Sequence, residues 1–127
     1  MNEKIVIDKL YLKGIISFNN KEFYDAHEYW EELWSDYKVK DPKFIQALIQ
    51  LAVGFFHITN FNRNGALGLF RKSKEKFVNF PNNHRNQDLL KIIQCIDESV
   101  EQINQIPDKR NLNKFNWENI IELNEEY

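Results

Sequence analysis

The residues with the clearest chemical potential lie between positions 27 and 31, where the sequence reads His-Glu-x-x-Glu. On a helix, His27 and Glu31 are one turn apart and can present two ligands to one metal ion. Glu28 could then act as a general base, and His57 could supply a third ligand from a later segment. The motif resembles the zinc-protease helix with Glu in place of its second His, so the chemistry would be metal-dependent hydrolysis or oxidation.

The same segment carries large aromatic side chains on the side of His27. At about 100° per residue, His27 and Glu31 share one arc of about 100° with three aromatic residues, Phe23, Trp30 and Trp34. We therefore expect this arc to face the interior. Because burial of an unpaired carboxylate costs several kcal/mol, Glu31 would need a donor, and His27 is the nearest one.

A narrow stripe of polar side chains follows on the next apolar segment, at Gln46, Gln50, His57 and Asn60. If the two segments pack as antiparallel helices, the stripe and the arc meet inside the protein. The result would be a polar cluster of six residues: His27, Glu28, Glu31, Trp34, Gln50 and His57. Two interpretations stay open, a satisfied hydrogen-bond network in the core and a pocket that binds a ligand or a divalent metal ion through His27, Glu31 and His57.

The elements that position this cluster are predicted to be helices in one domain spanning residues 1–127. Apolar residues recur at helical spacing, and only 4 Gly and 3 Pro interrupt the chain. Helix-start residue types stand at Asp41-Pro42 and at Asn62. We expect five main helices, over about residues 4–18, 21–36, 42–60, 63–80 and 87–105. A short terminal helix is expected around Trp117, Ile120 and Ile121, which are spaced i, i+3, i+4.

The third helix is apolar around most of its circumference and should therefore be the buried centre of an all-α bundle. Gly65 and Gly68 lie about one turn apart near the start of the fourth helix. Small residues at that spacing let two backbones approach closely, so we predict tight helix packing there.

Charge and cysteine content restrict the class of protein. With 17 Lys and Arg against 19 Asp and Glu, the net charge of −2 excludes an overall basic nucleic-acid binder. A local basic face on the fourth helix, formed by Arg71, Lys72 and Lys76, leaves weak phosphate or nucleic-acid binding as an alternative to a solvated surface. His84, in an Asn-rich stretch, is expected to be exposed. A single cysteine, Cys95, favours a reducing, cytoplasmic setting, and no apolar run approaches the ~20 residues that span a membrane.

The central part of the chain resembles the domain of unknown function 309 family. The likeness rests on the run Phe18–Trp34, with its aromatic-acid-Ala-His-Glu-x-x-Glu-x-x-Trp pattern, on Gln46–Ala52 with His57, and on Asn62–Ala66. It covers about residues 10–80 and implies a small all-helical fold. The helices expected within residues 86–127 are predicted from periodicity alone. The family has no assigned activity, so the resemblance implies no catalytic residues. The family's signature positions correspond here to His27, Glu28, Glu31, Trp34, Gln50, His57, Gly65 and Ala66.

These observations favour a cytoplasmic binding or interaction protein whose polar cluster specifies the core or opens into a small pocket. Its partner would be a small molecule, a protein or a second copy of the chain, and no membrane is expected. The alternatives are a metal-dependent hydrolase or oxidase, and a weak phosphate or nucleic-acid binder. The sequence leaves open whether the protein is an enzyme.

Overall fold

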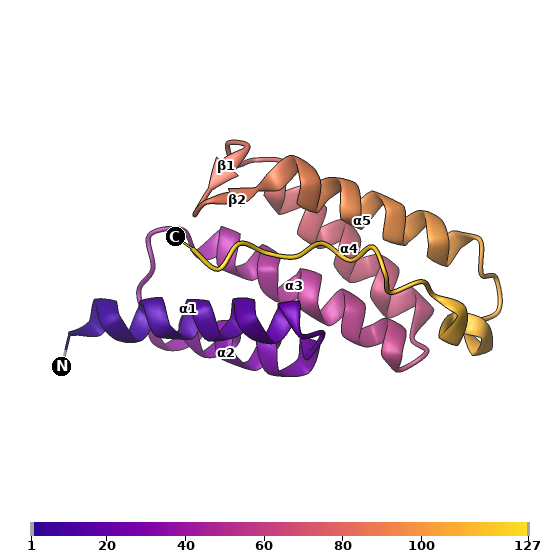
Figure 1. The fold of residues 1–127 in the computed structure, drawn as a ribbon, viewed down its shortest axis with the longest axis horizontal. Helices are drawn as coiled ribbons and strands as arrows, with labels where there is room; N and C mark the ends of the chain where they lie inside the picture. The colour runs from indigo at the N-terminus through magenta and orange to yellow at the C-terminus, as the bar shows by residue number, and fades with distance from the viewer. Residues whose placement is uncertain (1, 127) are drawn as a thin grey trace.

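The computed structural model describes residues 2–126, which form five α-helices, a short β-hairpin and a 3-10 helix (Figure 1). The elements are α1 (Glu3–Asn19), α2 (Phe23–Asp36), α3 (Pro42–Thr59), α4 (Arg63–Phe77), β1 (Asn83–His84), β2 (Gln87–Asp88), α5 (Leu89–Asn104) and η1 (Lys109–Lys114). Helices hold 69% of the described residues, which confirms the all-α prediction with five main helices.

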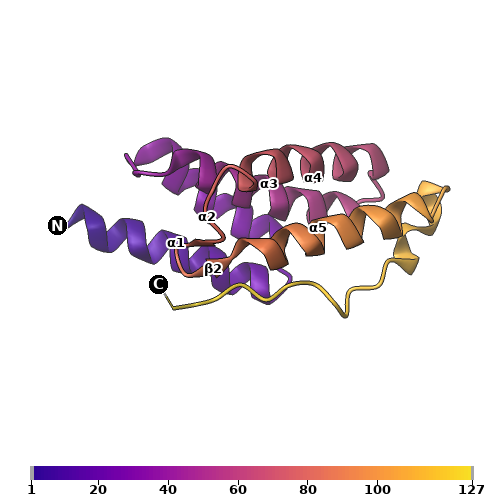
Figure 2. The same cartoon turned by 90° about the horizontal axis from the view of Figure 1, so that it is seen from above.

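The helix α3 is the centre of the bundle, as the sequence predicted. It packs against α2 on one side and α4 on the other, while α1 packs on α2 and α5 on α4 (Figures 1 and 2). The Phe55 ring, which is fully buried, lies 5.2 Å from the ring of Phe23 and 4.9 Å from that of Phe70. Aromatic pairs at these distances stabilise a core beyond the effect of burial alone.

Polar residues at the helix starts act largely as their types suggest. The side chain of Asn62 accepts a hydrogen bond from the Gly65 N–H at 2.9 Å and caps α4. Asp41 precedes α3 and its first-turn proline, yet its carboxylate makes no capping hydrogen bond. That carboxylate is therefore available for another contact.

A β-hairpin stands where the sequence indicated only a polar loop. Asn83 pairs with Asp88 and His84 with Gln87 in antiparallel register. The two loop residues, Arg85 and Asn86, both have positive φ, 48° and 62°, as the favoured type I′ hairpin turn requires. The prediction that His84 is exposed is wrong, because its side chain is only 22% accessible.

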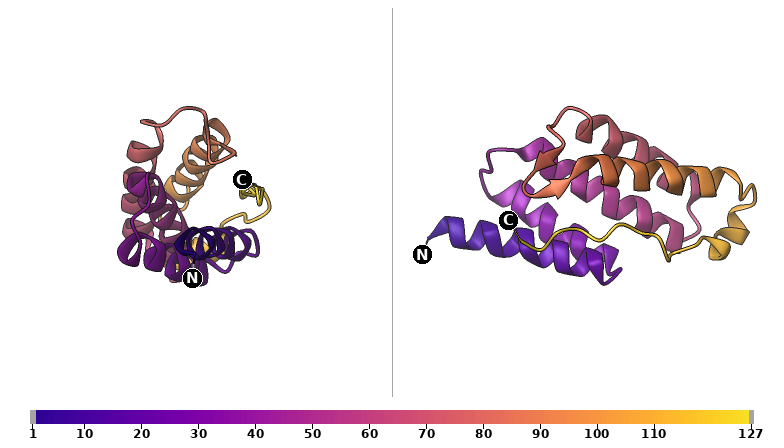
Figure 3. Two further views of the ribbon diagram at one scale, coloured as in Figure 1. Left: turned by 90° about the vertical axis from the view of Figure 1, so that its left-hand side faces the viewer. Right: turned by 45° about the horizontal axis from the view of Figure 1, so that its top comes forward.

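The prediction of a terminal helix around Trp117 is also wrong. Residues 115–126, called the strap below, form no helix and run as an extended segment past α5 toward α1 (Figures 1 to 3). Phe115 and Leu123 are buried, and the ring of Trp117 stacks on Phe23 at 5.7 Å. Apolar spacing that suits a helix thus also suits an extended segment laid over a groove.

The close approach predicted at Gly65 and Gly68 is not formed. A Cβ atom at Gly68 would meet no atom within 4 Å, and one at Gly65 would meet the capping side chain of Asn62 rather than another helix. The close approach occurs at Gly14, where a Cβ atom would overlap the Trp30 indole. Because the indole N–H donates to the Tyr11 carbonyl oxygen at 3.2 Å, the ring is held against α1.

Two matched glycine substitutions test this packing. Gly14→Ala should lower the free energy of unfolding by about 3 kcal/mol, since the added methyl group displaces a buried indole and its hydrogen bond. Gly68→Ala should raise it by about 1 kcal/mol, because alanine favours a helix interior and the space is open. Urea denaturation measures both values, and equal effects would contradict the assignment of the close approach to Gly14.

Candidate functional site

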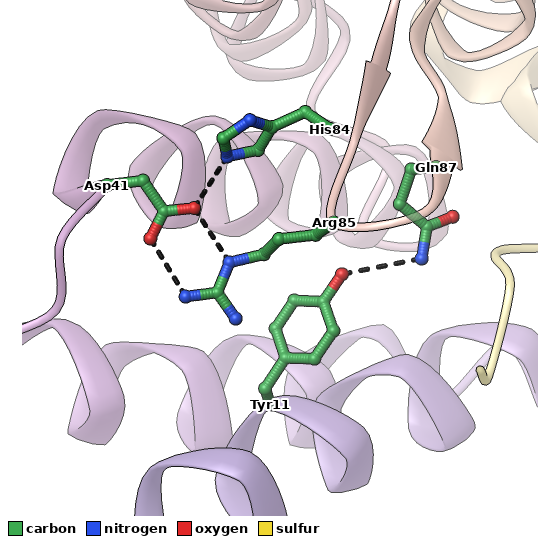
Figure 4. A network of polar contacts seen from close by, with 5 residues as sticks. All are labelled: Tyr11, Asp41, His84, Arg85 and Gln87. Atoms are coloured by element: carbon green, nitrogen blue, oxygen red, sulfur yellow. Dashed lines mark hydrogen bonds and ion pairs between the residues drawn. The ribbon is translucent and has the colours of Figure 1, made fainter. Parts of the chain in front are cut away.

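A buried ion-pair cluster lies at the N-terminal end of α3 (Figure 4). The Asp41 side chain is 6% accessible, and its two carboxylate oxygens accept hydrogen bonds from Arg85 Nε at 2.7 Å and from Arg85 Nη2 at 2.8 Å. His84 Nε2 lies 2.7 Å from the oxygen that Nε also contacts. We call Asp41, His84 and Arg85 the aspartate clamp.

Aromatic rings enclose the aspartate clamp. The His84 imidazole packs against the rings of Phe44, at 4.5 Å, and Phe80, at 4.8 Å. The Arg85 guanidinium stands over the Tyr11 ring at 4.7 Å, within the range of a cation–π interaction. The clamp therefore fixes the hairpin to α3 and to α1 at once.

The electrostatics of the clamp favour the charged carboxylate. Burial by itself would raise the pKa of Asp41, but the hydrogen bonds from Arg85 and His84 outweigh burial and leave the pKa below its ordinary value. Burial would likewise lower the pKa of Arg85, and the Asp41 carboxylate reverses that effect, so the pKa of Arg85 is raised. Each charge is thus compensated by the other.

Asp41→Asn should lower the free energy of unfolding by about 3 kcal/mol at neutral pH, because Arg85 stays buried without a counter-charge. A carboxyl group whose pKa is lowered by folding stabilises the protein above its ordinary pKa of about 4. That contribution is lost as the pH falls through the folded-state value. The difference between wild type and variant should therefore shrink below about pH 4 in urea denaturation, and a difference independent of pH would contradict this role.

A small pocket lies near the opposite end of α3, between α3 and α2. It has a volume of about 140 Å³ and is lined by five residues, Tyr24, His27, Val53, Phe56 and His57. We call it the histidine pocket. The Tyr24 ring is 5.6 Å from the His27 imidazole and 5.4 Å from the Phe56 ring. The structure thus brings together the two histidines of the expected polar cluster.

A hydrogen bond donated by Asn62 determines the tautomer of neutral His57. Because Oδ1 of Asn62 accepts from the Gly65 N–H, the amide Nδ2 faces Nδ1 of His57, at 3.2 Å. An amide NH₂ only donates, so Nδ1 of neutral His57 accepts and its proton resides on Nε2. The cap of α4 and the donor of His57 are therefore fixed by one side chain.

The His27 imidazole has an unusual environment. Its Nδ1 is shielded from solvent and makes no hydrogen bond with the described residues; the nearest carboxylate oxygen, Oε1 of Glu28, is 3.7 Å away. Hydrogen bonding to Glu28 and repulsion by its charge raise the pKa of Tyr24. Glu28, 56% accessible, therefore lies close to the Tyr24 phenol and to the His27 imidazole.

The other residues of the expected cluster lie outside the histidine pocket. Glu31 and Trp34 are exposed, Trp34 to 40%, so the expectation that they face the core is wrong. The residues that α2 does bury are Phe23, Ala26, Trp30 and Leu33. Gln50 accepts a hydrogen bond from Lys76 Nζ at 2.9 Å and is two helical turns, about 10 Å along the axis, from His57.

The expected metal ligands do not converge. Within residues 2–126, no group of three or more His, Cys, Asp or Glu side chains could hold a metal ion, so His27, Glu31 and His57 do not form the hypothesised centre. On the basic face of α4, Arg71 pairs with Glu75 at 3.6 Å, and Lys74, close by, pairs with Asp97 at 2.8 Å. Acidic neighbours thus compensate part of the positive charge on which phosphate binding would depend.

Burial raises the pKa of the Cys95 thiol, which disfavours the reactive thiolate. None of the helices in the described part of the chain is both long and apolar enough to cross a membrane.

The substitution Asn62→Asp tests the link between the α4 cap and His57. Aspartate still accepts from the Gly65 N–H, so we expect stability to change by less than about 1 kcal/mol. A carboxylate cannot donate to Nδ1, so the neutral imidazole should move its proton from Nε2 to Nδ1. Long-range ¹H–¹⁵N correlation spectra distinguish the tautomers, and an unchanged tautomer would contradict the inferred hydrogen bond.

Comparison with known proteins finds a family resemblance over the part of the chain that holds the histidine pocket. No curated protein matches the chain. The family model described as domain of unknown function (DUF309) matches residues 11–69, which include all five pocket residues and Asn62. His84 and Arg85 of the aspartate clamp lie outside the match. The resemblance expected from the sequence is thus confirmed over this range, where residues 11–69 are similar to the DUF309 domain.

Proposed function

We propose that this protein is a binding protein whose histidine pocket takes one ring-sized apolar group that carries an oxygen acceptor. The observation that carries the proposal is the convergence of His27 and His57 on a small, mainly apolar pocket, with the proton of His57 held on Nε2. Such a combination of apolar walls and few oriented polar groups is typical of small-molecule sites.

The size of the pocket supports a single ring. An apolar cavity of ~150 Å³ in another protein binds benzene, and the histidine pocket is of similar volume, about 140 Å³. Val53 and Phe56 supply apolar contacts, and Tyr24, which is 52% exposed, stands at the entrance.

The polar groups support an oxygen-bearing ligand. The His57 Nε2–H would donate to a hydroxyl or carbonyl oxygen of the bound group. His27 lines the same pocket, and its side chain is 25% accessible. The buried Nδ1 of His27, which makes no hydrogen bond in the described part of the chain, costs stability, and polar groups left in this way are typical of functional sites.

The cellular setting that we propose is a reducing one, such as the cytoplasm. Cys95 is the single cysteine of the chain and is buried, so it forms no internal disulfide.

Homodimerisation stays a prediction. The large apolar side chains that are exposed are spread over α1, α2, α5 and the loops that follow α3 and α4: Ile5, Ile16, Tyr24, Trp34, Phe61, Val78 and Leu90.

Phenol and benzene are suitable probes of the pocket. We expect phenol to bind with a dissociation constant on the order of 1 mM, and benzene about fivefold more weakly because it lacks the oxygen. Amide NMR titration should show the largest shifts around His27 and His57. Equal affinity for both probes would contradict the role of the His57 donor.

A pocket-filling variant provides the matched test. Val53→Phe places a ring in the pocket and should abolish the phenol-induced shifts, whereas Val78→Phe, at a site 55% exposed, should leave them unchanged. Far-ultraviolet circular dichroism verifies that both variants fold. If phenol binds Val53→Phe as it binds wild type, or shifts no resonance near the pocket, the proposal is wrong.

A further inference from the structure

The strap, residues 115–126, has no regular structure of its own and depends on the groove that it occupies. It passes α5, where the Ile121 N–H lies 3.5 Å from Cys95 Sγ, and reaches the last residue of α1, Asn19 (Figures 1 and 3). The hairpin contacts its far part through Gln87. The groove is thus formed by three elements that are distant in sequence.

Three amide side chains of the groove bind the main chain of the strap in the same way. Asn19 accepts from the Leu123 N–H at 2.8 Å and donates to the Leu123 carbonyl oxygen at 2.9 Å. Gln87 does the same with Asn124, at 2.8 Å for both bonds. Gln102 accepts from the Asn116 N–H at 2.9 Å and reaches its carbonyl oxygen at 3.5 Å. On the strap, these contacts involve main-chain atoms only, so they do not depend on the identity of the side chains of the strap.

Apolar side chains of the strap supply the selectivity. Phe115 and Leu123 are 3% and 2% exposed, and Trp117 stacks on Phe23. Main-chain hydrogen bonds combined with pockets for selected side chains are the arrangement by which proteins bind extended peptides.

We propose that the groove between α1, α5 and the hairpin is a peptide-binding site that accepts the strap of a second copy of this chain. A strap supplied by another copy would make the same contacts with Asn19, Gln87 and Gln102, and exchange of an identical segment is a low-cost route to a dimer. The short connection of residues 105–108 before η1 includes Pro107, which cannot continue α5.

A labelled peptide of residues 115–126 tests the proposal on the full chain by fluorescence anisotropy. In wild type the chain's own strap competes at a high effective concentration, so binding should be weak. Leu123→Asp places a charge at a buried position of the strap and leaves the groove intact. It should tighten peptide binding at least tenfold. Asn124→Pro removes the backbone N–H that donates to Gln87 and the exposed side-chain amide that contacts Asn86 and Glu126, and it should act in the same direction.

A second substitution in the Leu123→Asp background identifies the groove. Adding Asn19→Ala removes both hydrogen bonds to Leu123 of the peptide and should weaken binding by roughly tenfold or more. Asn20→Ala, at the adjacent exposed position, should have no effect. If the strap variants bind the peptide no better than wild type does, or if Asn19→Ala and Asn20→Ala behave alike, the proposal is overturned.

Discussion

The burial of α3 on nearly all sides is the constraint on which the rest of the structure depends. A helix surrounded by α2, α4 and aromatic side chains cannot hold polar groups along its middle without partners. The charged and titratable side chains of α3 and its cap are therefore found near the two ends of the helix. Asp41 stands just before the first turn and His57 in the last turn, and each is matched by groups from other elements.

The two ends meet this constraint in different ways. At Asp41 the carboxylate is fully compensated by Arg85 and His84, so the site holds the hairpin in place and leaves little for a ligand to bind. Near His57 the compensation is incomplete, since Asn62 orients one imidazole while Nδ1 of His27 has no hydrogen-bond partner within residues 2–126. Satisfied polar groups rigidify a structure, whereas an unsatisfied one costs stability and is more often found at a functional site.

The sequence predicted the helices well because local signals determine them. Asn62, Pro42 and the apolar periodicity lie within the elements that they define. The orientation of α2 was predicted less well. Its buried side includes Ala26 and Leu33 and is rotated about the helix axis away from Trp34, which the prediction had placed in the core. The pairing of Asp41 with Arg85 spans 44 residues, and no local spacing indicates it. The triplet around Trp117 has helical spacing, but tertiary contacts hold it extended.

The central claim is that the histidine pocket is a binding site whose donor is set in advance by Asn62. The most direct measurement is a long-range ¹H–¹⁵N imidazole spectrum of wild-type protein during titration with phenol. The account predicts that neutral His57 carries its proton on Nε2 before phenol is added and that this nitrogen shifts on saturation. A proton on Nδ1 of His57, or imidazole resonances that phenol leaves unchanged, would contradict it.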